Sequence, residues 1–116
     1  MKKVFWIGSS YKDLMDFPDV VRRAMGHALF SAQGGKLHPH AKVLSGMGNA
    51  SIQEIRENDG GGTYRMIYTV EMKGCVFVLH AFQKKSKSGI ATPKQEIDLL
   101  NGRLKEAKAL YKSMNI

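Results

Sequence analysis

Apolar positions in the first third of the chain predict one strand followed by two helices. The run from Lys3 to Ile7 ends at a Gly-Ser-Ser turn and predicts a short strand. Ser9 or Ser10 can cap a helical turn over residues 11–17, and Pro18 then opens a second helix. The apolar face of that second helix comprises Val20, Val21, Ala24, Met25, Ala28 and Leu29. We expect this face to pack against the core.

The middle of the chain predicts a three-stranded meander. Gly34-Gly35 ends the second helix, and Lys36 to Ala50, which holds a proline and two glycines, is expected to be a connection. Alternating polarity and β-branched or aromatic residues then predict strands over Ser51–Asn58, Thr63–Glu71 and Cys75–Phe82. The connections between these strands are short and contain glycine, which favours antiparallel pairing.

The C-terminal segment predicts an amphipathic helix. Thr92 can cap this helix, Pro93 suits its first position, and Gln95 is placed to close a capping box. Its apolar seam is Ile97, Leu100, Leu104, Ala107, Tyr111 and Met114. The order of elements predicts an α+β fold, in which a small antiparallel sheet packs with N-terminal helices and a C-terminal amphipathic helix.

Alternation along the predicted strands assigns side chains to faces of the sheet. The expected core side of the second strand of the meander is Tyr64, Met66, Tyr68 and Val70. Arg65 is therefore expected on the opposite, exposed face. Strict alternation on the third strand groups Val76, Val78, His80 and Phe82. On the first strand, Glu54 and Arg56 share a side, but the pattern does not tell whether that side is buried.

Composition bounds the class of protein. At 116 residues, with 43% hydrophobic and 24% charged residues, the chain fits one globular domain over residues 1–116. The single cysteine, Cys75, excludes an internal disulfide framework, and the apolar run after Met1–Lys3 is too short for a signal peptide or membrane span. We therefore expect a cytoplasmic protein without a membrane partner.

The net charge of +8 and the pI near 9.8 favour polyanionic partners, nucleic acid above all. Lys84, Lys85 and Lys87 follow the last predicted strand, close to the face that is expected to expose Arg56 and Arg65. Guanidinium groups grip phosphate oxygens in a bidentate fork, and lysines add mobile positive charge. These residues predict a phosphate-binding surface. The alternatives are an ordinary solvated loop, a basic protein that is merely soluble, or a surface for an acidic protein partner.

The remaining motifs give weaker indications of function. The His38-Pro39-His40 pair has no nearby acidic or thiol ligand, so a loop role is favoured over a metal site. The glycines do not have the spacing of a phosphate-binding loop. We expect no metal and no cofactor.

Several of these motifs together carry a family resemblance. They are Lys42–Gly46, Ile55-Arg56, Tyr64–Tyr68, Leu79–Lys85, Thr92-Pro93 and Arg103. In this order they resemble the RelE/ParE toxin superfamily, closest to its HigB-like, phage-derived branch, over roughly residues 3–110. The resemblance implies a RelE-like fold, in agreement with the α+β prediction.

The resemblance implies a toxin of a type II toxin–antitoxin system that cuts mRNA on the ribosome, without a metal, by attack of the ribose 2′-hydroxyl on the adjacent phosphate. The implied partners are the ribosome, mRNA and a cognate antitoxin, expected to be a small helix-turn-helix protein. In the family pattern Arg65 stabilises the phosphate and Lys85 is the basic residue at the strand exit. Arg56 faces the same region, and Lys84 and Lys87 are expected to bind RNA.

The sequence departs from the family pattern in its proton-transfer groups. Gln53 and Glu54 stand where some relatives place lysines, and no tyrosine follows the lysine stretch closely. Glu54 is then a candidate base, and His80 a candidate acid or base, because the usual pKa of histidine lies near neutrality. A buried, hydrogen-bonded His80 is the alternative. At the level of function, the alternatives are a nucleic-acid or antitoxin-binding module without catalysis, and a ParE-like gyrase poison.

Overall fold

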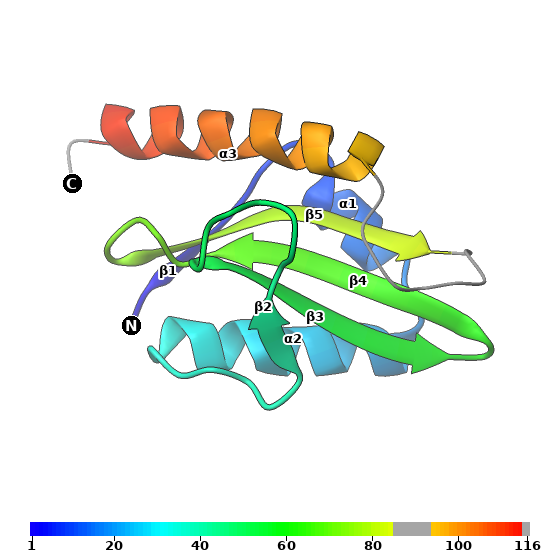
Figure 1. Cartoon of the computed structure of the whole chain (residues 1–116). Coiled ribbons are helices and arrows are strands. Elements are labelled where there is room, and N and C mark those ends of the chain that lie inside the picture. Colours follow the sequence, from blue (N-terminus) through cyan, green and yellow to red (C-terminus); the bar gives the residue numbers. More distant parts are fainter. Residues whose placement is uncertain (85–93, 115–116) are drawn as a thin grey trace.

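The computed structural model describes residues 1–84 and 94–114. Its elements, in chain order, are β1 (Lys3–Trp6), α1 (Ser10–Met15), α2 (Asp19–Gln33), β2 (Ala41–Val43), β3 (Ile52–Asp59), β4 (Gly62–Thr69), β5 (Cys75–Lys84) and α3 (Lys94–Ser113). The strands form a five-stranded sheet in the order β1-β5-β4-β3-β2 (Figure 1). β1 runs parallel to β5, and the other neighbours are antiparallel. The predicted α+β fold is confirmed.

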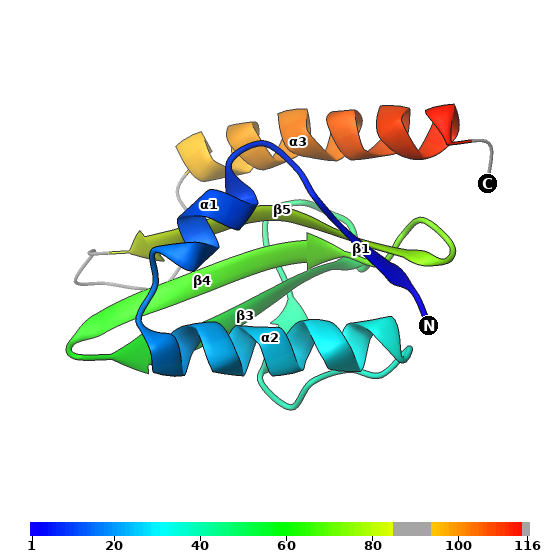
Figure 2. The same ribbon diagram turned by 180° about the vertical axis from the view of Figure 1, so that it is seen from behind.

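Helices cover both faces of the sheet. α2 and α1 lie on one face, seen from the front in Figure 2, and α3 lies along β5 on the other side (Figures 1 and 2). The core on the α2 face includes Val21, Met25, Ala28, Leu29, Ile55, Met66, Tyr68, Val76, Val78 and Ala81. The core on the α3 face includes Leu44, Ile52, Ile67, Cys75, Phe77, Leu79, Leu100, Leu104 and Ala107. The expectation of an open face opposite Tyr64, Met66 and Tyr68 is therefore wrong.

The helical patterns are confirmed with small corrections. Val20 is exposed rather than part of the apolar face of α2, because it lies about 100° from Val21 around the helix, outside the stripe of buried residues. Pro18 lies just before α2, where its carbonyl accepts the first helical hydrogen bond from Arg22. On α3, Leu100, Leu104 and Ala107 are buried, and Ile97, Tyr111 and Met114 pack against the same core.

The hairpin between β3 and β4 fixes the register that the candidate site depends on. Asp59 pairs with Gly62, so Gly60 and Gly61 form a two-residue turn, and both have positive φ angles, 57° and 83°. Glycine adopts these angles without strain, and such turns match the twist of the strands. From this turn the pairing places Arg56 opposite Arg65.

A β-bulge in β5 overturns the strict alternation predicted there. Tyr68 pairs with Val78, but the preceding residue Ile67 pairs with His80, so Leu79 is an extra residue between the two pairs. The bulge changes which face the following residues take. His80 and Phe82 therefore lie on the α3 face, opposite Ile67 and Arg65, instead of sharing the face of Val76 and Val78.

Two features of the sheet were not predicted. The segment expected to be only a connection contains β2, which pairs with β3 at one edge of the sheet. β1 pairs with β5 at the other edge, from Lys3 opposite Cys75 to Trp6 opposite Val78. Among the described residues, no helix is long and apolar enough to span a bilayer.

Candidate functional site

Charged side chains from β3 and β4 form an ion cluster on the α3 face of the sheet. Glu54 and Arg56 are two residues apart on β3, and Arg65 pairs with Arg56 across the strands, so all three side chains point to the same face. Arg65 Nη1 donates to Glu54 Oε2 at 3.1 Å, and Arg56 Nε donates to Glu54 Oε1 at 3.1 Å. Each carboxylate oxygen of Glu54 thus orients one guanidinium group. We call these three residues the Glu54 cluster.

Arg65 is fully buried, with 0% of its surface exposed, which corrects the expectation that it stands on an exposed face. Burial lowers the pKa of its guanidinium, and the charge of Glu54 opposes this shift. An arginine stays protonated at neutral pH even so. The Arg56 side chain is about a third exposed. The cluster therefore presents positive charge at its Arg56 end, over a buried carboxylate and a second arginine.

His80 lies on the same face, two strands from Glu54, because Ile67 pairs with both residues. Its Nε2 contacts the Glu96 carboxylate of α3, and its Nδ1 lies 3.2 Å from Nη1 of Arg103. Burial lowers the pKa of His80, and the hydrogen bond to Glu96 partly offsets this. A neutral ring that donates from Nε2 to Glu96 and accepts at Nδ1 from Arg103 satisfies both contacts. The buried, hydrogen-bonded alternative for His80 is confirmed.

Arg103 connects α3 to the bulged part of β5 and to the N-terminal turn. Its Nη1 donates to the carbonyl oxygen of Leu79 at 2.9 Å, and its Nη2 donates to Ser9 Oγ at 3.2 Å. The guanidinium also packs over Gly8, which has a φ of 57°, and a Cβ at Gly8 would approach Arg103 Nε to 2.7 Å. Arg103 therefore joins three parts of the fold, namely α3, the bulge residue Leu79 and the turn at Gly8-Ser9.

Glu96 was not predicted as a site residue, and Arg103 was noted only through the family resemblance. A signal was present, because Glu96, Leu100, Arg103 and Ala107 are spaced by 4, 3 and 4 residues on one side of α3. Polar residues at buried seam positions indicate specific partners. Nothing in the spacing names those partners, which come from β5.

The basic stretch after β5 is only partly described. Thr63 pairs with Lys84 at the end of the strand, two positions beyond the pairing of Arg65 with Phe82. The Phe82 ring stacks on His80 with a centroid distance of 4.5 Å. Lys85, Lys87 and the predicted Thr92-Pro93 helix start lie outside the described residues. The backbone of Lys84 is thus at the same end of the sheet as Arg56 and Arg65.

His38 and His40, which lie just before β2, have hydrogen-bond partners close by. His40 Nδ1 lies 2.8 Å from Glu57 Oε2, and the His40 amide donates to His38 Nδ1 at 3.0 Å. Glu57 is on the face of β3 opposite Glu54 and Arg56. Within residues 1–84 and 94–114, no three His, Cys, Asp or Glu side chains are grouped as a metal site requires.

Comparison with known proteins assigns the chain to a family. No curated protein matches the chain. The family of phage-derived Gp49-like proteins matches residues 12–105, which include the Glu54 cluster, His80, Glu96 and Arg103. Because this match covers most of the sequence, the chain belongs to the phage-derived Gp49-like family, a group related to the RelE-like toxins of toxin–antitoxin systems.

Proposed function

We propose that this protein is the toxin of a type II toxin–antitoxin system and cleaves mRNA on the ribosome without a metal, as a member of the HigB-like branch. The observation that carries the proposal is the Glu54 cluster, in which one buried carboxylate orients two arginines in register on adjacent strands. Its place at the lysine-bearing end of the sheet, in a chain of a toxin-related family, favours a phosphate-binding role.

The cluster suits the charge that develops in RNA cleavage. The 2′-hydroxyl loses its proton and its oxygen attacks the adjacent phosphorus, the bond to the 5′-oxygen breaks, and the products are a 2′,3′-cyclic phosphate and a 5′-hydroxyl that has taken up a proton. The phosphoryl oxygens carry extra negative charge during this step, and pre-oriented guanidinium groups stabilise it. We assign the partly exposed Arg56 to this charge directly, and the buried Arg65 to it through the ion cluster that it shares with Arg56 and Glu54. Lys85 is assigned to the same phosphate, and Lys84 and Lys87 to the flanking RNA backbone, since lysines are protonated at neutral pH and act as charges rather than bases.

We assign proton transfer to Glu54 and His80, both of which make contacts in the folded chain that RNA would have to replace. Each oxygen of Glu54 already accepts a hydrogen bond from an arginine, and each ring nitrogen of His80 contacts α3. Either group can take the 2′-hydroxyl proton only after one of these contacts is exchanged for RNA. The lowered pKa of His80 favours a base over an acid at neutral pH.

The same contacts support the second candidate, a nucleic-acid or antitoxin-binding module without catalysis, since every proton-transfer group assigned above has a partner in the folded chain. A gyrase poison on this fold also needs no catalytic residue. In each version the chain acts as one domain in the cytoplasm. The +8 charge suits an antitoxin that brings an acidic segment, and a small helix-turn-helix protein is the partner we propose.

Induced expression followed by mapping of mRNA 5′ ends tests the proposal. New 5′ ends within translated regions, dependent on translation, support the ribosome-dependent nuclease. Translation arrest with intact mRNA supports the binding module. Intact mRNA with DNA-damage signalling supports the gyrase poison.

A further inference from the structure

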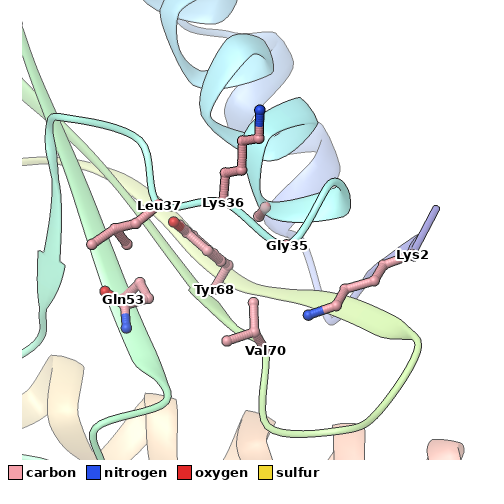
Figure 3. Close-up of a pocket in the computed structure, with 8 residues that line it drawn as sticks. Lys2, Gly35, Lys36, Leu37, Gln53, Tyr68 and Val70 are labelled. Atoms are coloured by element: carbon pink, nitrogen blue, oxygen red, sulfur yellow. The ribbon is translucent and has the colours of Figure 1, made fainter.

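A pocket of about 140 Å³ lies on the α2 face of the sheet, opposite the Glu54 cluster. It lies between the end of α2 with the residues after it on one side and β3 and β4 on the other, and it is partly open to solvent (Figure 3). The lining residues are Lys2, Ala32, Gly35, Lys36, Leu37, Gln53, Tyr68 and Val70. None of these residues has a role in the function proposed above.

Two buried polar atoms line this pocket without a hydrogen-bond partner among the described residues. They are the hydroxyl of Tyr68, which is 1% exposed, and Oε1 of Gln53, which is 9% exposed. The two residues pair directly across β3 and β4, and Figure 3 shows the Tyr68 oxygen turned toward the Lys36-Leu37 segment. Leaving such groups unpaired in a protein interior is costly, so they indicate a polar ligand.

A hydrogen bond of its amide nitrogen fixes the orientation of the Gln53 side chain. Its Nε2 donates to the carbonyl oxygen of Ala50 at 2.9 Å, which leaves Oε1 as the acceptor of this side chain. The Tyr68 hydroxyl can donate or accept, and burial raises its pKa, so it stays protonated. The pocket therefore offers one fixed acceptor beside one hydroxyl donor.

Lys2 adds a positive charge at the rim. Its amide donates to the carbonyl oxygen of Gln33 at 3.0 Å, and Gln33 Nε2 donates to the Lys2 carbonyl at 2.8 Å, which fixes the backbone there. In Figure 3 the Lys2 ammonium group points toward Val70. Val70 and Leu37 supply apolar contacts. A matching ligand needs an anionic group, a hydrogen-bond donor and a small apolar part.

We propose that this pocket binds small α-hydroxy carboxylates. The carboxylate pairs with Lys2 and accepts from the Tyr68 hydroxyl, the ligand hydroxyl donates to Gln53 Oε1, and the alkyl part contacts Leu37 and Val70. A cavity of comparable size holds benzene, so the pocket accommodates roughly six non-hydrogen atoms, the size of lactate. For so small a ligand the dissociation constant is expected on the order of 1 mM.

Titration of the ¹⁵N-labelled chain with sodium lactate, followed by amide chemical shifts, tests this site. We expect saturable shifts around Gln53, Tyr68 and Gly35. Propionate lacks the donor for Gln53 and lactamide lacks the charge for Lys2, so each is expected to bind roughly tenfold more weakly, the effect of one lost hydrogen bond or ion pair.

Tyr68→Phe separates binding from folding. Removing an unpartnered buried hydroxyl is expected to leave the stability equal or higher, while lactate affinity falls roughly tenfold. Tyr64→Phe is the matched control, because Tyr64 is on the same face of β4 but packs against Phe17 away from the pocket, and it should bind lactate like the parent. No saturable shift up to about 50 mM lactate, which would mean a pocket that holds only water, overturns the proposal. Equal lactate affinity in the parent and Tyr68→Phe overturns it as well.

Discussion

Replacing Glu54 by glutamine removes the charge that holds two arginines on the α3 face. Breaking a buried ion pair by removing one partner typically costs about 3–5 kcal/mol, because the other charge stays buried. Arg65 is in this position, with no exposed surface. Two features reduce the cost. Glutamine keeps one carbonyl oxygen as an acceptor, and the Arg56 side chain, 31% exposed, can turn to water. We expect Glu54→Gln to lower the free energy of unfolding by about 2–3 kcal/mol.

Urea unfolding at neutral pH measures this change, with Glu57→Gln as the matched control. Glu57 is on the same strand, but it faces the other side of the sheet and pairs with the exposed His40. Such a pair contributes at most about 1 kcal/mol. With a urea dependence of about 1–3 kcal/mol per molar, Glu54→Gln should lower the unfolding midpoint by roughly 0.7–3 M, and Glu57→Gln by much less.

Equal, small losses in the two variants would refute this reasoning, because the arginines would then not depend on Glu54. A changed slope of the urea dependence, without a change in midpoint, would also contradict it. That result would indicate a different native or denatured state instead of a lost ion pair.

Three further results are expected. Since burial lowers the pKa of His80 below the unfolded value of 6.5, the unfolded chain binds this proton more tightly. The free energy of unfolding should therefore fall as pH drops below about 6.5, by at most about 1.4 kcal/mol per pH unit, until the folded pKa is reached. If the free energy of unfolding of His80→Asn falls with pH as steeply as that of the parent, the prediction is contradicted. Gly8→Ala should cost about 1 kcal/mol more in urea unfolding than Gly35→Ala. Both glycines have positive φ, but only at Gly8 would the added Cβ push the Arg103 guanidinium away from its hydrogen bonds to Leu79 and Ser9; equal costs refute that contact. Antitoxin association, followed by stopped flow, should slow as salt rises, and rates independent of salt argue against electrostatic docking.

The sequence predicted the elements that depend on local periodicity. The seam of α3 and the glycine turn between β3 and β4 are visible in the residues themselves, and both are confirmed. β2 was missed because a strand of three residues has no period of its own and exists through its pairing with β3. The place of β1 beside β5 likewise depends on a pairing between distant segments.

The candidate site was predicted as a set of residues but not as an arrangement. Alternation grouped Glu54 with Arg56 correctly, yet it put Arg65 on an open face, because nothing local tells that a helix later in the chain covers that side. His80 was assigned to the wrong face because the bulge at Leu79 is set by pairing across strands.

The central claim is that the arginines of the Glu54 cluster stabilise the phosphate during RNA cleavage. Single-turnover cleavage on mRNA-programmed ribosomes tests it with Arg56→Gln, since Arg56 is partly exposed and its loss disturbs the core less than the loss of Arg65. Arg23→Gln, an exposed arginine of α2 on the opposite face, is the control. We expect Arg56→Gln to cleave about 10²–10³-fold more slowly and Arg23→Gln to match the parent. A folded Arg56→Gln that cleaves at the parent rate would contradict the account.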